Sequence, residues 1–428
     1  MTTPAPLPLT RIDSRRLLGR LEELAAIGSD PAGGVTRLAF SAEELAAKQL
    51  LLGWYEQAGL APSIDTAGNV VAILRGDGSG QGFLATGSHL DTVVAAGSLD
   101  GAYGAVAAVE VAGVLARIAA PLRRDIAFVA FTNEEGARGA PGFSGSLAVT
   151  GQLSELLLSS RDDEGIALSE RVRAGGGDPS RIAEAAWAPG QLAGFVELHV
   201  EQGPVLDASG ERLGVVSSCP GRLIVDVELR GSANHAGTTP MALRADALAA
   251  AAEVVLAVEQ LAVSGAVQVA TTGLARIEPA VRNVVPGFAQ LGIDIRDGDE
   301  GRLAAAGELL ASAIEGIARR RGVEAVVKAK QAVAAVACDR TIQAAIARAA
   351  DTLGHPARTM PSGAGHDAQI IAALGPVGMI FVPSVDGRSH CPQETTDPAD
   401  LVLGVQMLLA TLVELDASLS PREQEASP

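Results

Sequence analysis

The chain has 428 residues, more than one compact core usually holds, so two domains are expected. Hydrophobic residues make up 48% of the sequence and charged residues 19%, which excludes extended disorder. The formal net charge of −17 argues against nucleic acids and anionic membranes as partners, because both bind through a surplus of Lys and Arg.

Two helices are predicted near the N-terminus. Leucines from Leu17 to Leu24 recur at helical spacing and predict an amphipathic helix. Ser41 followed by Glu44 is a capping box, a pattern that starts helices. The second helix is therefore expected to run from this box to about Gln57.

The next segment alternates apolar strands with a helix. Strands are predicted at 70–74, 83–86 and 126–131, with a helix from 102 to about 118. These strands are apolar on both faces, which is typical of a mainly parallel sheet sandwiched by helices. We therefore expect an α/β catalytic domain whose ligands bind at the carboxyl edge of the sheet.

The pattern changes near Ser217, where strict alternation begins. The order of the predicted elements is β-α-β-β-α-β over about 110 residues, which is the ferredoxin-like order. The predicted elements are strands at 223–229, 267–271, 291–295 and 323–328 and helices from about 242 and at 302–319. We predict an inserted α+β domain at 217–329, within a discontinuous α/β domain formed by 1–216 and 330–428. A helix at 341–353 and a buried strand at 377–382 complete the latter.

Several features favour a cytoplasmic protein. Its cysteines, Cys219, Cys338 and Cys391, are an odd and scattered set without the spacing of a disulfide framework. Prolines interrupt the N-terminal segment before an apolar run builds, unlike a signal peptide. The most apolar later stretch, 245–263, contains acidic residues at a spacing that suits an amphipathic helix better than a membrane span.

Polar residues cluster at the ends of the first predicted strands. His89 and Asp91 follow one strand, and the adjacent carboxylates Glu134 and Glu135 follow another, while Asp100 precedes a helix. Each cluster alone has an ordinary explanation, such as a hydrogen-bonded strand-end histidine, an N-cap aspartate or a solvated loop. As a metal ligand, His89 would need a partner such as the Asp91 carboxylate to orient its ring.

Two later histidines extend the set. His199 lies on one face of a strand with Glu197 and Glu201, which by itself could mark an exposed edge, and His390 follows the last strand. Taken together, the candidates supply three imidazoles and two carboxylates, a donor set suited to Zn²⁺, Mn²⁺ or Co²⁺. If Asp100 bridges, it can serve two ions at once.

Blocks of sequence around these residues resemble one branch of a known enzyme family. They are GSHLDTV, LDGAYG, FTNEEG, ELHVEQGPVL, ANHAGTTPM, RNVVP, DIRD, SGAGHDA and DGRSHCPQE. In this order they resemble the hydantoinase/carbamoylase-type amidases among the dinuclear aminoacylase and carboxypeptidase-type metallopeptidases. That branch includes N-carbamoyl-L-amino acid hydrolases, β-ureidopropionases and allantoate amidohydrolases. The resemblance covers the chain from about Arg11 to Leu415.

The resemblance implies a site with two divalent ions per subunit, Zn²⁺ first, with Mn²⁺, Co²⁺ or Ni²⁺ as alternatives. Asp100 would bridge the ions, and Glu134 would be the general base. A histidine at 199, where peptidase relatives tend to have an acidic ligand, resembles the amidase branch. The implied metal ligands are His89, Asp100, Glu135, His199 and His390.

The resemblance also implies roles for the inserted domain, as a lid and a dimerisation domain. His235 would stabilise the oxyanion, and Asn283 and Arg296 would bind the substrate carboxylate, with Gln202 and His366 as further polar contacts. Lid residues of this family complete the partner's site, so a homodimer is expected. Without the metal set, the preferred interpretations would be a simple polar turn at His235 and a surface ion pair at Arg296.

The implied reaction is cleavage of the carbamoyl C–N bond of an N-carbamoyl-L-amino acid, releasing the amino acid, ammonia and CO₂. Allantoate and β-ureidopropionate are alternative substrates, and an N-acyl amino acid deacylase or dipeptidase is a more remote alternative. A non-catalytic binding protein would have lost the base or a ligand, and neither is missing. Ser98, Leu99 and Cys391 depart from the family pattern, which leaves the shape of the substrate pocket open; Cys391 is expected to be a small buried thiol.

Overall fold

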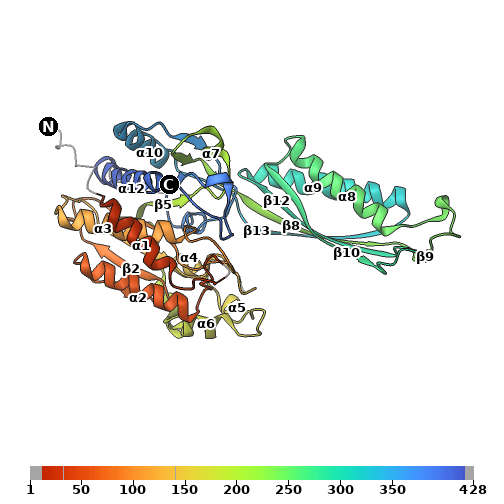
Figure 1. Cartoon of the computed structure of the whole chain (residues 1–428), viewed down its shortest axis with the longest axis horizontal. Helices are drawn as coiled ribbons and strands as arrows, with labels where there is room; N and C mark the ends of the chain where they lie inside the picture. Colours follow the sequence, from red (N-terminus) through yellow and green to blue (C-terminus); the bar gives the residue numbers. More distant parts are fainter. Residues whose placement is uncertain (1–11, 32, 140, 420–428) are drawn as a thin grey trace, which may run out of the picture. The chain divides into compact units, whose positions relative to one another are not determined.

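The structure, a computed structural model, describes residues 12–31, 33–139 and 141–419, and it forms two compact units (Figure 1). The first unit joins the chain up to Ser217 with Cys338–Met360 and the part from His366 onward. The second contains Ser218–Ala337 and Pro361–Gly365, so it extends beyond the 217–329 segment predicted as an insertion. Most of the N-terminal segment that we compared with a signal peptide lies outside the described residues.

The first unit contains an eight-stranded sheet of order β1-β2-β4-β3-β5-β16-β6-β15. Its central strands β4, β3, β5 and β16 pair in parallel, whereas β2 and β6 flank them in antiparallel pairs. The prediction of a mainly parallel α/β sheet is therefore confirmed. The strands are β1 (Ser63–Ile64), β2 (Val70–Leu74), β3 (Phe83–His89), β4 (Ile126–Phe131), β5 (Leu192–Val200), β6 (Gly214–Val216), β15 (Arg358–Met360) and β16 (Val377–Val382).

The predicted helices of this unit are present. Ser41 caps the second of them by accepting a hydrogen bond from the Glu44 amide, and the Glu44 carboxylate accepts one from the Phe40 amide. The long helices are α1 (Ser14–Ala25), α2 (Ala42–Gln57), α3 (Ala102–Arg117), α10 (Arg340–Leu353) and α12 (Pro398–Ser418). Short helices are α4 (Ser144–Val149), α5 (Glu155–Leu158), α6 (Leu168–Ala174), α7 (Val205–Ser209) and α11 (Asp367–Ile371), with 3-10 turns at Pro179–Ala185 and Val385–Gly387.

Strand β5 shows how the sheet separates core from site. Val196, Leu198 and Val200 belong to the main hydrophobic core, to which α3 and α12 also contribute. Successive side chains of a strand point to opposite faces, so Glu197 and His199 face the other side. There the Ala368 amide of α11 donates to Glu197. Polar site residues therefore share one face of a strand whose other face holds the core.

Among the described helices, α12 is long and apolar enough to cross a membrane. Within its apolar window, 67% of the residues are buried inside the protein. Met407, Leu408 and Leu412 belong to the main core. Such burial is that of a core helix in a soluble protein.

The second unit has a four-stranded antiparallel sheet of order β10-β12-β8-β13. Two helices, α8 and α9, lie side by side over one face of it (Figure 1). This order and the single helical layer are those of the ferredoxin-like arrangement. The elements are β8 (Gly221–Arg230), α8 (Ala247–Val263), β10 (Val269–Glu278), β12 (Phe288–Asp297), α9 (Glu300–Arg321) and β13 (Glu324–Val333). Short pairs join β9 (Asn234–His235) to β11 (Val284–Val285) and β7 (Ser218–Cys219) to β14 (Val336–Ala337), and a 3-10 turn lies at Met241–Leu243.

Candidate metal centre and active site

The five predicted metal ligands lie together in the first unit, at the carboxyl edge of the central strands. His89 ends β3, Glu135 follows β4, His199 lies near the end of β5 and His390 follows β16, while Asp100 precedes α3. Parallel strands end on the same edge of a sheet, so neighbouring strands bring residues far apart in sequence to one place.

Asp100 is at the centre of this cluster. Its Oδ1 lies 3.4 Å from Nε2 of His89 and 3.3 Å from Nε2 of His199. Its Oδ2 lies 3.0 Å from Nε2 of His390, which is itself 3.3 Å from Oε1 of Glu135. The two oxygens of one carboxylate therefore face different histidines.

The ligand atoms form two groups that share Asp100. His89, Asp100 and His199 make one group, and Asp100, Glu135 and His390 make the other, with all ligand atoms of a group within 4.8 Å of one another. Further sets meet the same criterion, among them His89 with Glu134 and Glu135. The Glu135 Oε1 atom is buried and accepts no hydrogen bond, as expected of an atom placed to bind an ion. Imidazoles and carboxylates without cysteine fit a divalent metal ion.

The pKa shifts in the cluster also fit a site for a divalent cation. Burial opposes ionisation of Asp100, but hydrogen bonds from His199, His390 and His89 hold its pKa well below the ordinary value. Burial also opposes protonation of His89, but Asp100 and neighbouring carboxylates raise its pKa well above the usual range. The hydrogen bond to Asp100 and the adjacent Glu135 raise the pKa of His390 to about 10. The carboxylates thus stabilise positive charge in the site.

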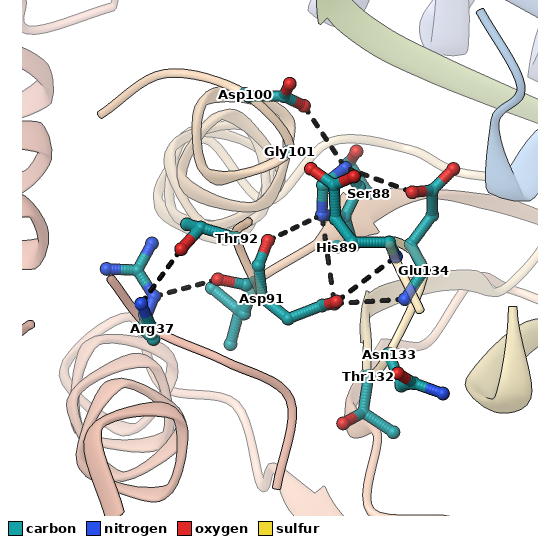
Figure 2. Close-up of polar contacts among 12 residues, drawn as sticks. Arg37, Ser88, His89, Asp91, Thr92, Asp100, Gly101, Thr132, Asn133 and Glu134 are labelled. Atoms are coloured by element: carbon teal, nitrogen blue, oxygen red, sulfur yellow. Dashed lines mark hydrogen bonds and ion pairs between the residues drawn. The ribbon is translucent and has the colours of Figure 1, made fainter. Parts of the chain in front are cut away.

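Asp91 contacts His89 through its backbone as well as its side chain. His89 Nδ1 donates to the main-chain carbonyl of Asp91 at 2.9 Å, whereas the Asp91 carboxylate lies 3.8 Å away (Figure 2). The carboxylate instead accepts hydrogen bonds from the amides of Glu134 at 3.0 Å and Glu135 at 3.2 Å. Asp91 therefore orients His89 through its backbone, and its side chain holds the two consecutive glutamates.

Glu134 has the properties of a general base. It is buried, and its Oε2 lies 4.0 Å from His89 Nε2. Burial raises its pKa well above the ordinary value, and the charges of Glu135, Asp367 and Asp91 add to the effect, although His89 opposes it. A carboxyl group with a raised pKa can accept a proton and return it near neutral pH.

A residue with left-handed backbone conformation turns the chain just before the two glutamates. Asn133, with φ of 55°, turns the chain directly after β4. Its side-chain amide donates to Pro141 O and Ser144 Oγ, which fixes this turn.

Gln202 and His366 also lie beside the cluster. Gln202 Nε2 donates to Asp100 Oδ2 at 2.7 Å. The His366 ring is buried with its centroid 4.8 Å from that of His199. Cys391 is half-buried rather than buried.

His235, Asn283 and Arg296 belong to the second unit, so the structure does not join them to the metal ligands in one body. His235 and Asn283 are neighbours, because the Ala236 amide donates to the Asn283 carbonyl and β9 pairs with β11. Arg296 lies at the other end of β12, where it bonds to the Asp294 carboxylate and the Gly363 carbonyl. The length of β12 separates these two places by about 26 Å, at about 3.3 Å per residue.

Sequence reasoning missed one residue that contacts the ligand loops. The buried Glu394 carboxylate accepts hydrogen bonds from the amides of Leu99 and Asp100. Glu394 ends the DGRSHCPQE block, so its position in that block was the available signal.

A buried carboxylate and imidazole cluster at the carboxyl edge of a parallel sheet, with an adjacent base, defines a hydrolase with a divalent metal site. Residues 85–414 match the model of peptidase family M20/M25/M40, and the chain belongs to this family of C–N bond hydrolases.

The chain is similar to named amidohydrolases over nearly its whole length. The N-carbamoyl-L-amino acid amidohydrolase of Geobacillus stearothermophilus is 39% identical over 404 residues, which cover 94% of this chain and 99% of the relative. The allantoate amidohydrolase of Bacillus subtilis is 35% identical over 398 residues, 92% of this chain and 96% of the relative.

A solved structure shows the same likeness. The crystal structure of an amidase of the hydantoinase/carbamoylase family from Burkholderia multivorans has a TM-score of 0.86 and 34% identity, covering 97% of this chain and 100% of that one. The predicted resemblance to this branch is confirmed.

Proposed function

We propose that the protein is a dinuclear metal-dependent amidohydrolase that cleaves the carbamoyl C–N bond of N-carbamoyl-L-amino acids. The observation that carries the proposal is the sharing of Asp100 between two three-residue ligand groups, with Glu134 beside them. The 39% identity to an N-carbamoyl-L-amino acid amidohydrolase supports the substrate class. The 35% identity to an allantoate amidohydrolase favours allantoate as the second candidate.

Two groups of residues would each hold one of the ions. His89, Asp100 and His199 would hold one divalent ion, and Asp100, Glu135 and His390 the other. When bound, the ions, with Zn²⁺ as the first candidate, would supply an activated water and polarise the scissile carbonyl. Nδ1 of His89 and of His199 each donates to a main-chain carbonyl, which leaves Nε2 of both rings as the ligand atom.

Glu134 moves the proton. It would accept a proton from the attacking water and deliver it to the leaving nitrogen, which its raised pKa favours. Water adds to the carbamoyl carbon, and the C–N bond to the amino acid breaks. The resulting carbamate decomposes to ammonia and CO₂.

Arg296 is proposed to bind the substrate carboxylate. Its side chain is 32% exposed, and it lines a groove of 510 Å³ in the second unit together with Arg222 and Asp294. A guanidinium can hold a carboxylate through two parallel hydrogen bonds, which fixes both position and orientation. A substrate with a carboxylate near its ureido group would use such a contact.

A homodimer is proposed to complete the site. His235 and Asn283 lie about 26 Å from Arg296 along the sheet, too far for one small substrate to reach both groups of one chain. A second copy that supplies His235 and Asn283 removes this difficulty. The exposed apolar side chains of α8, Leu248, Leu256 and Val263, and the edge strand β10 support the second unit as the surface of assembly.

A cytoplasmic location is also proposed. Cys338 and Cys391 form no disulfide within the described residues, which supports a reducing compartment.

An ammonia-release assay tests the proposed function. The metal-reconstituted protein is supplied with N-carbamoyl-L- and N-carbamoyl-D-amino acids, β-ureidopropionate and allantoate. The highest kcat/KM is expected for an N-carbamoyl-L-amino acid. A clear preference for allantoate would replace the first candidate by the second, and hydrolysis of dipeptides or N-acyl amino acids alone would contradict both.

A further inference from the structure

Glu394 lies where it can control the geometry of the shared ligand. Its Oε2 accepts hydrogen bonds from the amides of Leu99 at 2.8 Å and Asp100 at 3.1 Å. The side chain is buried, with a residue exposure of 6%. The backbone of Asp100 is thus held by a carboxylate that comes from the far end of the sequence.

The same carboxylate reaches the loop that carries His390. Ser389 Oγ lies 2.8 Å from Glu394 Oε1 and 3.1 Å from Asp100 Oδ2. Ser389 directly precedes His390, which has a left-handed φ of 55°. Glu394 therefore connects the loop of Asp100 with the loop of His390, two ligands of one group.

Glycine at position 97 permits this packing. A Cβ atom built at Gly97 would lie 2.1 Å from Glu394 Oε2, far inside van der Waals contact. The segment from Gly97 to Asp100 is therefore folded directly onto the carboxylate, and a larger residue there would displace it.

Glu394 also adds negative charge beside Asp100. Within the part of the chain that the structure describes, no Lys or Arg forms an ion pair with Glu394. A buried carboxylate without a cation is costly, and divalent ions at the adjacent ligands would supply the missing positive charge.

We infer that Glu394 is a positioning residue for the metal pair: it fixes the shared ligand Asp100 through the main-chain amide and couples it to His390 through Ser389. This inference rests on the proposed dinuclear site but not on the identity of the substrate. Glu394 belongs to none of the ligand groups, and it acts through the ligands that it holds.

The test compares metal affinity with stability. Glu394→Gln keeps the shape of the side chain but turns one acceptor into a donor and removes the charge. Competition with a fluorescent zinc chelator should show affinity for Zn²⁺ reduced roughly 10- to 100-fold, as for other residues that orient ligands. In the activity assay kcat should fall while KM changes little, because Glu394 does not contact the substrate.

Asp416→Asn is the matched control. Asp416 is also buried, and its carboxylate also accepts hydrogen bonds from two consecutive amides, those of Arg123 and Arg124, without touching a metal ligand. This variant should lose stability in the metal-free state and keep wild-type zinc affinity. Should Glu394→Gln behave like Asp416→Asn, losing stability but not zinc affinity, the inference is overturned.

A milder variant covers the case in which Glu394→Gln does not fold. Ser389→Ala keeps the amide contacts and removes the hydroxyl that bonds to Glu394 Oε1 and Asp100 Oδ2. It should weaken zinc binding by a smaller factor, and an unchanged zinc affinity would contradict the inference. Because zinc binding is read without substrate, a wild-type protein that binds zinc but hydrolyses no ureido compound would refute the proposed function and leave this test intact.

Discussion

At the scale of single residues, the proposed mechanism gives two adjacent glutamates different roles, and one carboxylate holds both. Asp91 accepts hydrogen bonds from the amides of Glu134 and Glu135, so the two side chains leave a fixed backbone. Oε1 of Glu135 lies 3.3 Å from His390, whereas Oε2 of Glu134 lies 4.0 Å from His89. Substitutions at the two positions should therefore have different effects.

Glu134→Gln should reduce kcat by about 10²- to 10⁴-fold, since the amide cannot accept the proton of the attacking water. Metal content should stay at the wild-type level, because Glu134 is proposed as base and not as ligand. Atomic emission of the purified protein measures the metal content, and the ammonia-release assay measures kcat. The idea fails if the variant keeps full activity.

Glu135→Gln is the companion variant, with the same chemical change at the next residue. It should lower metal content, because Oε1 of Glu135 belongs to the ligand group of Asp100 and His390. Added metal should restore part of its activity, and none of the activity of Glu134→Gln.

Metal binding should release protons and strengthen as pH rises. The pKa values of His89 and His199 are raised and that of His390 is raised to about 10, so in the metal-free protein the protonated rings are stabilised at neutral pH. A cation must displace these protons, and the competition disappears as pH rises through the pKa values. Zinc affinity should therefore increase from about pH 6 to about pH 9.

Calorimetric titrations in two buffers of different ionisation enthalpy measure this release. The heat should differ between the buffers by an amount that corresponds to more than one proton per chain. Equal heats in both buffers would show that the imidazoles are already neutral before the metal arrives.

The sequence was enough to predict which polar residues would lie together, but not the hydrogen bonds that hold them. Strand ends and family blocks identified His89, Asp100 and His390, since ligands follow the chain order of the strands. The hydrogen bonds of the Asp91 carboxylate to the Glu134 and Glu135 amides were not predicted, because the left-handed turn at Asn133 that presents these amides has no reliable sequence signal. Glu394 was missed because its contact with Leu99 spans 295 residues of sequence.

At the scale of elements, a buried ion triad joins α1 to α3. Glu110 has no exposed side-chain surface, Arg16 binds it through Nε and Nη2, and Arg20 binds it at 2.6 Å. Replacing both arginines by Met should cost about 3–5 kcal/mol of unfolding free energy, because a buried carboxylate loses its cations. Urea unfolding followed by circular dichroism measures the loss.

The triple variant with Glu110→Met is the control. It removes the buried charge together with its partners, so most of the lost stability should return. If the triple variant is no more stable than the double one, packing of the arginine side chains rather than charge holds the two helices together.

Elements with strong periodicity were predicted well, and edge elements were not. Helices α2, α3 and α10 lie within a few residues of their predicted bounds, and the Ser41 and Asp339 side chains cap α2 and α10. Strand β10, predicted at 267–271, runs over Val269–Glu278. It is an edge strand with mostly exposed side chains, so its length is set by pairing with β12, which the local pattern does not reveal.

At the scale of the whole molecule, the proposed dimer makes a prediction about mixed subunits. Glu134→Gln and His235→Ala should each be inactive alone. If His235 serves the partner's site, a mixed dimer has one complete site, made of the base of one chain and the His235 of the other. Random exchange of subunits should then restore about a quarter of wild-type activity.

Subunit exchange under mild denaturant followed by the ammonia-release assay tests this. The control is the double variant, which carries His235→Ala and Glu134→Gln in one chain. Taken through the same exchange by itself, it should stay inactive. No recovery in a mixture shown to contain mixed dimers would place His235 and Glu134 in the same chain's site.

The order of the ligands along the chain has a consequence for biosynthesis. The group of His89, Asp100 and His199 is complete before the second unit, Ser218–Ala337, is translated, whereas His390 follows it. A nascent chain can thus present the first group long before it can close the second. If both ions bind as proposed, the second can be bound only after the segment that carries His390 has been translated.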